Sequence, residues 1–303
     1  MEKVAVIVCN FASFDEEVIK NYGIIPIVSN LLWEEENLLE GDNVFQKMRD
    51  AHKKGIKSSP KTSQPSLGTF KKYFEEALKE NEKVICITIS SKISGTYNAA
   101  IQTKKLLKTE QQERIYVIDS NNIDTAETLL AIKAVEIIKA ENDINKVIEA
   151  IKSYIPKTYF YGMTENPDQM EAGGRINHIL ALALKQMQKI GMRPILHMDD
   201  GVVKAANLRM NARDIAEALF NQFEDLNKEK FKEGKVFRIA ISHADNIVGA
   251  EKLKDLFESK YKSQVKIDFI SMTGIFIGAH VGPGTLMCAT LEDCLGPDTC
   301  DTH

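Results

Sequence analysis

Three polar segments carry side chains that could bind an anion or act as nucleophiles. They are Thr62–Ser66 (TSQPS), Ser90–Thr96 (SSKISGT) and Gly278–Thr285 (GAHVGPGT), the last with His280 among its glycines. Hydroxyl and backbone N–H groups at the start of a helix favour an anion, and glycines let a backbone approach a ligand closely. The segments therefore predict a site for a negatively charged group. Two structural alternatives explain the same residues: the hydroxyls only cap a helix, and the histidine lies in a structural loop.

A catalytic alternative uses the same segments. Ser94 stands in a turn between a strand and a helix, which is a suitable place for a nucleophile. His280 could serve as its base, and Asp119, which follows a neighbouring strand, could orient the histidine. The protein would then be a serine hydrolase acting on acyl esters. Nothing in the local sequence enforces an oxyanion hole, so Ser94 could as easily be a hydrogen-bond donor to a ligand.

Other catalytic and cofactor motifs are missing from the sequence. It contains no Walker A loop, no G-x-G-x-x-G after a strand, no G-x-S-x-G and no H-E-x-x-H. Cys294, Cys300 and His303 lie in a polar tail, but their spacing matches no zinc pattern. Cys9 and Cys86 stand in apolar runs and are expected to be small buried hydrophobes. We therefore predict no metal, no cofactor and no disulfide scaffold.

The first half of the chain alternates between strands and helices, which must position these segments. The expected strands are Lys3–Val8, Ile24–Val28, Val84–Ile89 and Ile115–Ile118. The expected helices are Asn43–Lys53, one after Ser66, Gly95–Lys108, Thr125–Lys139 and Ile144–Tyr154. This alternation predicts a mostly parallel sheet flanked by helices. Ligands of such sheets bind beyond the carboxyl ends of the strands, where the Ser90–Thr96 turn would lie.

The second half has a different pattern, and Pro156 marks the boundary. A strand at Thr158–Met163 and a helix at Ile176–Ile190 precede a hairpin whose turn is Asp199–Gly201. Further helices and strands are expected at Met210–Phe223, Lys235–Ser242, Asn246–Lys260, Val265–Ser271 and Thr285–Thr290. We thus expect an N-terminal α/β domain, 1–156, and a C-terminal α+β domain with a mixed sheet, 157–303. The tail 291–303 has no assignment.

The composition is that of an ordinary globular chain. Its 303 residues include 39 basic and 43 acidic side chains, a net charge of −4, and 44% are apolar. A mildly acidic chain is a poor candidate for binding nucleic acid. No apolar run reaches the roughly 18 residues of a membrane-spanning helix, and the apolar burst before Cys9 is too short for a signal peptide. The expected location is the cytoplasm.

The ordered set of motifs resembles the DegV family of bacterial fatty-acid-binding proteins along nearly the whole chain. The segments that carry the resemblance are Thr62–Ser66, Ser90–Thr96, Asp119-Ser120, Gly173–Ile176 (GGRI), Arg193–Leu196 with Asp200-Gly201, Asn207–Arg209, Ser242–Asn246 (SHADN) and Gly278–Gly284. The resemblance implies two domains with one long-chain fatty acid in a tunnel between them. It also implies that the protein presents the carboxylate to a separate fatty acid kinase, which makes the acyl phosphate, and has no catalytic cycle of its own.

The same resemblance assigns the site residues. Thr62 and Ser94 would hydrogen-bond the carboxylate, and His280 would lie beside it. The neighbouring ligand-binding positions are Ser63, Gly95, Thr96 and Gly282. Arg175 and Arg209 would lie at the pocket mouth or on the face that docks the kinase. Transient contact with a membrane surface also fits such a role.

The chain departs from the family pattern at its first strand. The family usually has Asp-Ser there, whereas this chain reads Cys9-Asn10-Phe11-Ala12-Ser13. The change removes one carboxylate from the strand ends where the fatty acid carboxylate is expected. A lipid carrier or sensor that hands nothing to a kinase is therefore kept as an alternative.

Overall fold

The computed structural model describes most of the chain. The described residues are 2–9, 12–14, 16–28, 31–33, 36–38, 43–54, 62–165, 171, 178–209 and 213–293. Arg175 and the Cys294–Cys300–His303 group, both singled out from the sequence, lie outside them. Within the described residues, no helix is long and apolar enough to cross a membrane.

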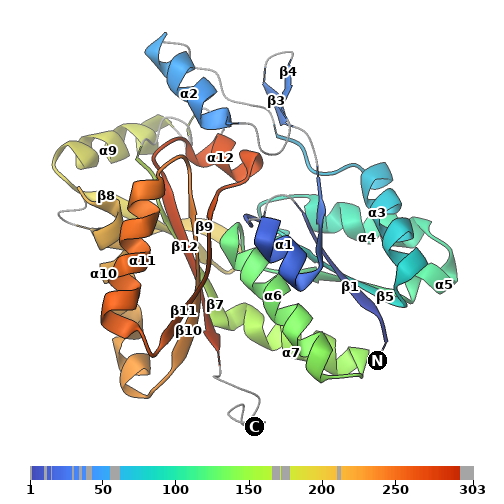
Figure 1. Ribbon diagram of the computed structural model, residues 1–303. Coiled ribbons are helices and arrows are strands. Elements are labelled where there is room, and N and C mark those ends of the chain that lie inside the picture. Colours follow the sequence, from blue (N-terminus) through green and yellow to red (C-terminus); the bar gives the residue numbers. More distant parts are fainter. Residues whose placement is uncertain are drawn as a thin grey trace.

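The first half forms a four-stranded parallel sheet, as the alternation predicted (Figure 1). Its strands lie in the order β2 (Ile24–Ile27), β1 (Val4–Cys9), β5 (Lys83–Thr88) and β6 (Ile115–Asp119). The central strands are buried on both faces, which explains their continuous apolar runs. The described helices of this half are α1 (Glu16–Tyr22), α2 (Val44–Lys53), α3 (Leu67–Glu80), α4 (Thr96–Leu106), α5 (Thr109–Gln112), α6 (Thr125–Ala140) and α7 (Ile144–Tyr154).

The second half forms a six-stranded mixed sheet, also as predicted. The strand order is β11 (Val265–Met272), β10 (Val236–His243), β12 (Leu286–Asp293), β7 (Thr158–Met163), β8 (Arg193–Asp199) and β9 (Val202–Arg209). Strands β10 and β11 run parallel and the other neighbours antiparallel. The helices of this half are α9 (His178–Lys189), α10 (Ile215–Lys232), α11 (Ile247–Tyr261) and α12 (Ile275–Val281), and η1 (Ile155–Lys157) joins the two halves. The boundary at 156/157 thus separates the two sheets; whether each half folds alone stays a prediction.

Helix α6 is the layer between the two sheets (Figure 1). It contacts β1, β5 and β2 of the first sheet and β12, β10 and β7 of the second. Ala126, Ala131 and Ala134 are fully buried, and their small side chains allow both sheets to come close. Most of its N-terminal and central residues are buried, and its apolar side chains belong to a hydrophobic cluster that contains residues of both halves.

Several elements differ from the sequence prediction. The glycine-rich segment around His280 is partly helical, because α12 runs through Gly278 and His280 to Val281. The first residues of the unassigned tail, Leu291–Asp293, belong to β12. Helix α10 begins at Ile215 and continues to Lys232, well past the predicted end. Helix α1 and the small hairpin of β3 (Leu31–Trp33) and β4 (Glu36–Leu38) were not predicted.

Candidate functional site

Thr62 and His280 meet at the junction of the two halves. The Thr62 Oγ1 atom lies 3.0 Å from the His280 Nε2 atom, and both side chains are partly buried. Thr62 precedes α3 of the first half, and His280 stands in the last turn of α12 of the second half. The two residues are 218 positions apart in sequence. Their contact joins a hydroxyl and an imidazole that the sequence analysis assigned to one carboxylate site.

The position of His280 is fixed by packing on both sides of α12. Gly278 lies against the Phe45 ring of α2 (Val44–Lys53), so closely that a Cβ atom there would come within 2.5 Å of the ring. The helix ends at Gly282, whose φ of 77° suits glycine. The Thr164 and Thr285 hydroxyls each donate to the Val281 carbonyl oxygen at 2.9 Å. The imidazole is therefore presented by a well-anchored helix end.

Ser94 lies in the turn that connects β5 to α4. Its Oγ atom is 2.7 Å from Thr96 Oγ1 and accepts a hydrogen bond from the Thr96 N–H group at 3.3 Å. Gly95 occupies the N-cap position and supplies no side chain. The Ser94 hydroxyl thus bonds the first residue of the helix without being its N-cap side chain, and it is only partly buried. Capping and ligand binding are compatible here, since the Ser94 oxygen accepts the Thr96 N–H group with a lone pair and its O–H group can donate to a carboxylate.

The TSQPS loop and the Ser94 turn are in direct contact. The Gln64 side chain lies against Gly95, where a Cβ atom would fall 2.0 Å from Gln64 Oε1. The loop side chain therefore occupies the space that a side chain at position 95 would take. Ser63 is exposed, whereas Thr96 and Gly282 are buried. All three predicted segments consequently meet in one region of the molecule.

The hairpin tip of the second half docks on the same turn. Gly201, at a φ of 73°, accepts a hydrogen bond from Ser90 Oγ to its carbonyl oxygen at 2.7 Å. A Cβ atom on Gly201 would lie 2.4 Å from Asn121 Oδ1. Beside it, Lys92 and Asp200 form an ion pair of 2.6 Å. The hairpin predicted from the Asp-Asp-Gly sequence thus fixes the second half to the segment that carries Ser94.

The described contacts do not assemble a serine hydrolase triad. The Asp119 carboxylate accepts the N–H groups of Ser91, at 3.2 Å to each oxygen, and of Asn121, at 3.0 Å. It therefore holds the turn backbone. The Ser94 hydroxyl is bonded to Thr96, and the Nε2 atom of His280 faces Thr62. Each of the three groups has partners other than those that nucleophilic catalysis would require.

Arg209, the second predicted docking residue, is engaged on α10. Its guanidinium group donates to Gln222 Oε1 at 2.6 and 3.0 Å and pairs with Asp225 at 2.7 Å. Its side chain is largely covered. The structure therefore places Arg209 at the end of β9 beside α10, and the contacts it makes there are not with the Thr62 loop.

Buried acidic groups at the carboxyl ends of β1 and β6 were missed by the sequence analysis. Asp124 precedes α6, and Glu127 lies in its first turn; both are fully buried. Burial raises the pKa of Glu127 well above its ordinary value; the backbone of Cys9 opposes this, and Asp124 and Asp119 add to it. Burial likewise raises the pKa of the Cys9 and Cys86 thiols, which are inert core groups as predicted. This edge of the sheet therefore has carboxyl groups, although the chain lacks the aspartate that the family usually has after its first strand.

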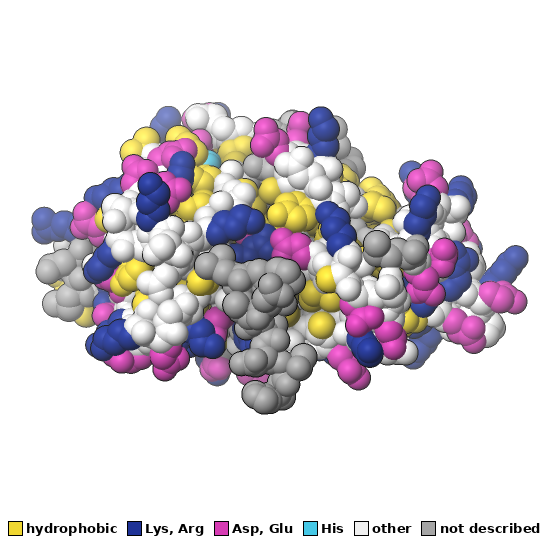
Figure 2. Space-filling view, turned by 60° about the horizontal axis from the view of Figure 1, so that its bottom comes forward, with side chains coloured by type: hydrophobic (Ala, Val, Ile, Leu, Met, Phe, Trp, Pro, Cys, Tyr) yellow, Lys and Arg dark blue, Asp and Glu magenta, His cyan; other side chains and the backbone are white. Residues whose placement is uncertain are grey.

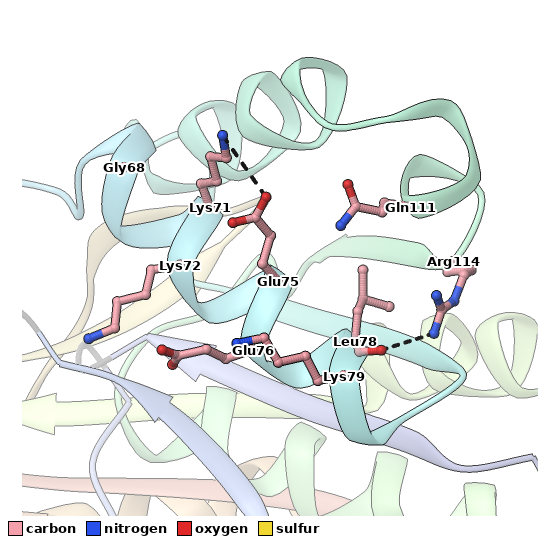
Figure 3. A pocket seen from close by; sticks show the side chains of 9 residues that line it. All are labelled: Gly68, Lys71, Lys72, Glu75, Glu76, Leu78, Lys79, Gln111 and Arg114. Atoms are coloured by element: carbon pink, nitrogen blue, oxygen red, sulfur yellow. Dashed lines mark hydrogen bonds and ion pairs between the residues drawn. The ribbon is translucent and has the colours of Figure 1, made fainter.

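A surface groove of about 520 Å³ lies on α3, apart from these residues (Figure 3). It is lined by Gly68, Lys71, Lys72, Glu75, Glu76, Leu78, Lys79, Gln111 and Arg114. Lys71 pairs with Glu75, and Arg114 donates to the Leu78 carbonyl oxygen (Figure 3). This charged lining does not suit an acyl chain, and the interdomain tunnel stays a prediction.

Charges of both signs lie on one face of the molecule. In the face shown in Figure 2, Lys and Arg side chains alternate with Asp and Glu, and apolar patches lie between them. Among the described residues, no group of three or more His, Cys, Asp or Glu side chains is arranged to hold a metal ion.

The chain is similar to several proteins that are described as fatty-acid-binding proteins. A fatty acid-binding protein of Thermotoga maritima is 30% identical over 296 residues, covering 94% of this chain and 96% of the relative. The structure of DegV, a fatty acid binding protein from Bacillus subtilis, is 25% identical and superposes with a TM-score of 0.77, covering 97% of this chain and all of that one (100%). A stearic acid-binding protein from Eubacterium ventriosum shares the fold, with a TM-score of 0.81, 21% identity and coverage of 96% and 98%.

The family pattern described as "uncharacterised protein, DegV family" matches residues 3–292, almost the entire chain. That span includes both sheets, the helix between them and all three polar segments. With a matched relative at 30% identity over nearly its full length, the chain belongs to the DegV family.

Proposed function

We propose that this chain binds one long-chain fatty acid between its two halves, with the carboxylate beside Thr62, Ser94 and His280. The contact between Thr62 Oγ1 and His280 Nε2, at 3.0 Å, carries the proposal. It joins groups from both halves, and the loop that carries Thr62 also contacts Gly95 at the start of α4. The fatty-acid-binding relatives support the same ligand class.

The apolar tail supplies most of the affinity in this proposal. Each buried methylene contributes about 0.8 kcal/mol, so a chain of about 15 methylenes contributes on the order of 12 kcal/mol before ordering costs. The site at the end of that tail need only replace the water that the carboxylate loses. The Thr62 and Ser94 hydroxyls and the imidazole of His280 are suitable donors.

The chemistry of these donors also suits transfer of the ligand. Hydroxyl groups satisfy a carboxylate without the tight charge pairing of an arginine, so its oxygen stays nucleophilic. In the proposal, a separate fatty acid kinase meets the protein in the cytoplasm and supplies the ATP and metal that phosphoryl transfer requires. This chain supplies the positioning of the carboxylate. Arg175 and the region of Arg209 are assigned to the pocket mouth or the kinase-docking face.

The first test is the lipid content of the purified protein. We expect mass spectrometry of an organic extract to find about one long-chain fatty acid per chain. The Thr62→Val, Ser94→Ala double variant should carry clearly less. Thr69→Val, which removes a threonine hydroxyl in the first turn of α3 that bonds Ser66, should carry as much as the parent. An extract free of fatty acid, together with no uptake of an added fluorescent fatty acid, would refute the proposed function.

The hand-off needs its own test, because binding does not require it. Labelled phosphate transfer from ATP to protein-bound fatty acid would be measured with a kinase from the same organism. We expect acyl phosphate with the parent protein and none with Arg175→Ala, while lipid content is unchanged. No transfer with the lipid-loaded parent would leave a lipid carrier or sensor.

A further inference from the structure

A buried polar cluster joins the two halves at the N-terminal end of α6. The Asp124 carboxylate accepts hydrogen bonds from three hydroxyls: Ser13 and Thr273, the latter at 2.9 Å, bind Oδ1, and Ser242 binds Oδ2. The four side chains are at most 3% exposed. Ser13 and Asp124 belong to the first half, and Ser242 and Thr273 to the second. The carboxylate is thus shared across the interface.

The cluster is continuous with the start of α12. Ser13 Oγ lies 3.1 Å from Thr273 Oγ1 and accepts the N–H group of Gly274, the N-cap of α12, at 3.2 Å. Thr128 of α6 in turn donates to the Ser13 carbonyl oxygen at 2.7 Å. The first turn of α6 is therefore linked through Ser13 to the first residue of the helix that carries His280.

The unusual backbone conformation of Asp124 indicates that surrounding contacts hold this residue in position. Its φ of 56° and ψ of −132° are unfavourable for a residue with a side chain, and no side-chain cap bond to α6 compensates for this. Such strain persists only where surrounding contacts enforce it. Here the enforcing contacts are the three hydroxyls, two of which lead to α12.

We propose that Asp124 is a positioning residue that sets the start of α12, and with it the approach of His280 to Thr62. The expected effect on fatty acid affinity rests on the proposed function. The placement of α12 and His280 by Asp124 does not depend on it. Helix α12 is short, so a displacement of Gly274 is passed directly to His280 six residues later. The other end is fixed by the Thr164 and Thr285 hydroxyls, which leaves the N-terminal end to Asp124 and Ser13.

The test uses NMR of protein labelled with ¹⁵N-histidine and no added lipid. The His280 resonances are assigned by their loss in His280→Gln. We expect Asp124→Ala and Ser13→Ala to shift the His280 Nε2 resonance, because its contact with Thr62 is weakened. Asp124→Asn keeps an acceptor oxygen for Ser13 and Thr273 and should restore the resonance towards that of the parent. Affinity for a fluorescent fatty acid should fall about tenfold in the first two variants and within about threefold in the third, the loss expected for one weakened hydrogen bond.

A matched control comes from the opposite end of the same helix. Glu136→Gln weakens the contacts of α6 with Arg238 and should lower stability without moving the His280 resonance. Should Asp124→Ala not fold, Ser13→Ala and Asp124→Asn still decide the question. Unmoved His280 resonances in the Ser13 variant would overturn the proposal, as would equal shifts in the Glu136 variant. If the parent binds no fatty acid, the proposed function fails, and the resonances still report on the positioning role.

Discussion

The two ends of α6 are attached to the second sheet by different chemistry. At its N-terminal end, Asp124 gathers hydroxyls from Ser13, Ser242 and Thr273. Towards its C-terminal end, Glu136 binds Arg238 of β10, which also holds Asp268 of β11. Ser242 and Arg238 lie four residues apart on β10, about 13 Å along the strand. The first attachment is linked through Ser13 to the start of α12, the helix that carries His280, and the second lies further along α6.

The Arg238 end is a closed ionic network. Its guanidinium lies 2.6 Å from Asp268 Oδ2 and 2.6 Å from Glu136 Oε2, and Lys133 pairs with Asp293 at 2.6 Å. Burial alone would lower the pKa of Arg238, but Asp268 and Glu136 more than offset this and raise it. The side chains of Arg238 and Asp268 are only 5% and 3% exposed. Every partner is committed to another protein group.

The two attachments of α6 therefore have different roles. The Arg238 network holds the halves together, and the Asp124 cluster positions the candidate site. The ionic network pairs charged groups of α6 with those of β10 and β11. The hydroxyl cluster around Asp124 is linked by hydrogen bonds to the start of α12. That helix carries His280, which contacts Thr62, and both of these side chains are partly accessible. The comparison predicts that changes at the Arg238 end alter stability, and that changes at the site alter affinity.

The largest effect is expected for Arg238→Met. The substitution removes the guanidinium bonds of the buried Asp268 and leaves it with the exposed Lys266, 3.0 Å away; breaking a buried ion pair on one side costs about 3–5 kcal/mol. Urea unfolding followed by circular dichroism should show this loss. Fatty acid affinity of the folded fraction should be unchanged. Lys232→Ala, which removes an exposed pair with Glu229, is the control and should leave the unfolding midpoint in place. If folded Arg238→Met lost affinity for fatty acid, the Arg238 network would also affect the site, and the two attachments would not have separate roles.

The next largest effect is expected on fatty acid affinity. Thr62→Val and Ser94→Ala should each weaken fatty acid binding by about 1.5–3 kcal/mol, roughly ten- to a hundredfold, because each removes one hydrogen bond to a charged oxygen. The Ser94 variant should also lose up to about 1 kcal/mol of stability, since its hydroxyl accepts the Thr96 N–H group. Titration with a fluorescent fatty acid and thermal melting would be compared. A lowered melting temperature with unchanged affinity would reduce Ser94 to a cap.

The sequence predicted the elements better than their contacts. Continuous apolar runs identified β1, β5 and β6, and the Asp199–Gly201 turn identified the hairpin, because these signals are local. Helix α12 was missed, since Gly278 there reflects packing against Phe45 and not a loop. The Asp124 cluster had no local signal: its partners lie 111, 118 and 149 residues away. The pairing of Thr62 with His280 was expected only from the family resemblance.

A third prediction concerns pH and the first turn of α6. Because the pKa of Glu127 is higher in the folded protein than its ordinary 4.5, the folded state binds more protons than the unfolded state above that pH. The contribution of Glu127 to stability therefore falls as pH rises, by at most about 1.4 kcal/mol per unit. Glu127→Gln removes the titrating group and should flatten this slope, so that the variant gains on the parent between about pH 5 and about pH 8.

Urea midpoints measured across that range would check the Glu127 prediction. Glu149→Gln on the exposed side of α7 is the matched control and should reproduce the parent slope. Parallel profiles for the parent and the Glu127 variant would show that this carboxyl group is ionised when folded.

The smallest effect is expected where the hairpin tip meets the Ser94 turn. Lys92 and Asp200 are 2.6 Å apart, but their side chains are 43% and 77% exposed, so water and salt screen the pair. Lys92→Ala should cost at most about 1 kcal/mol and leave affinity unchanged. Gly201→Ala is the informative contrast at the same contact, because its Cβ atom would collide with Asn121 and Ser90 at an unfavourable φ. Melting and fatty acid titration of both variants would be compared with the parent. A tenfold affinity loss in Lys92→Ala alone would make this lysine part of the carboxylate site and would extend that site to the hairpin.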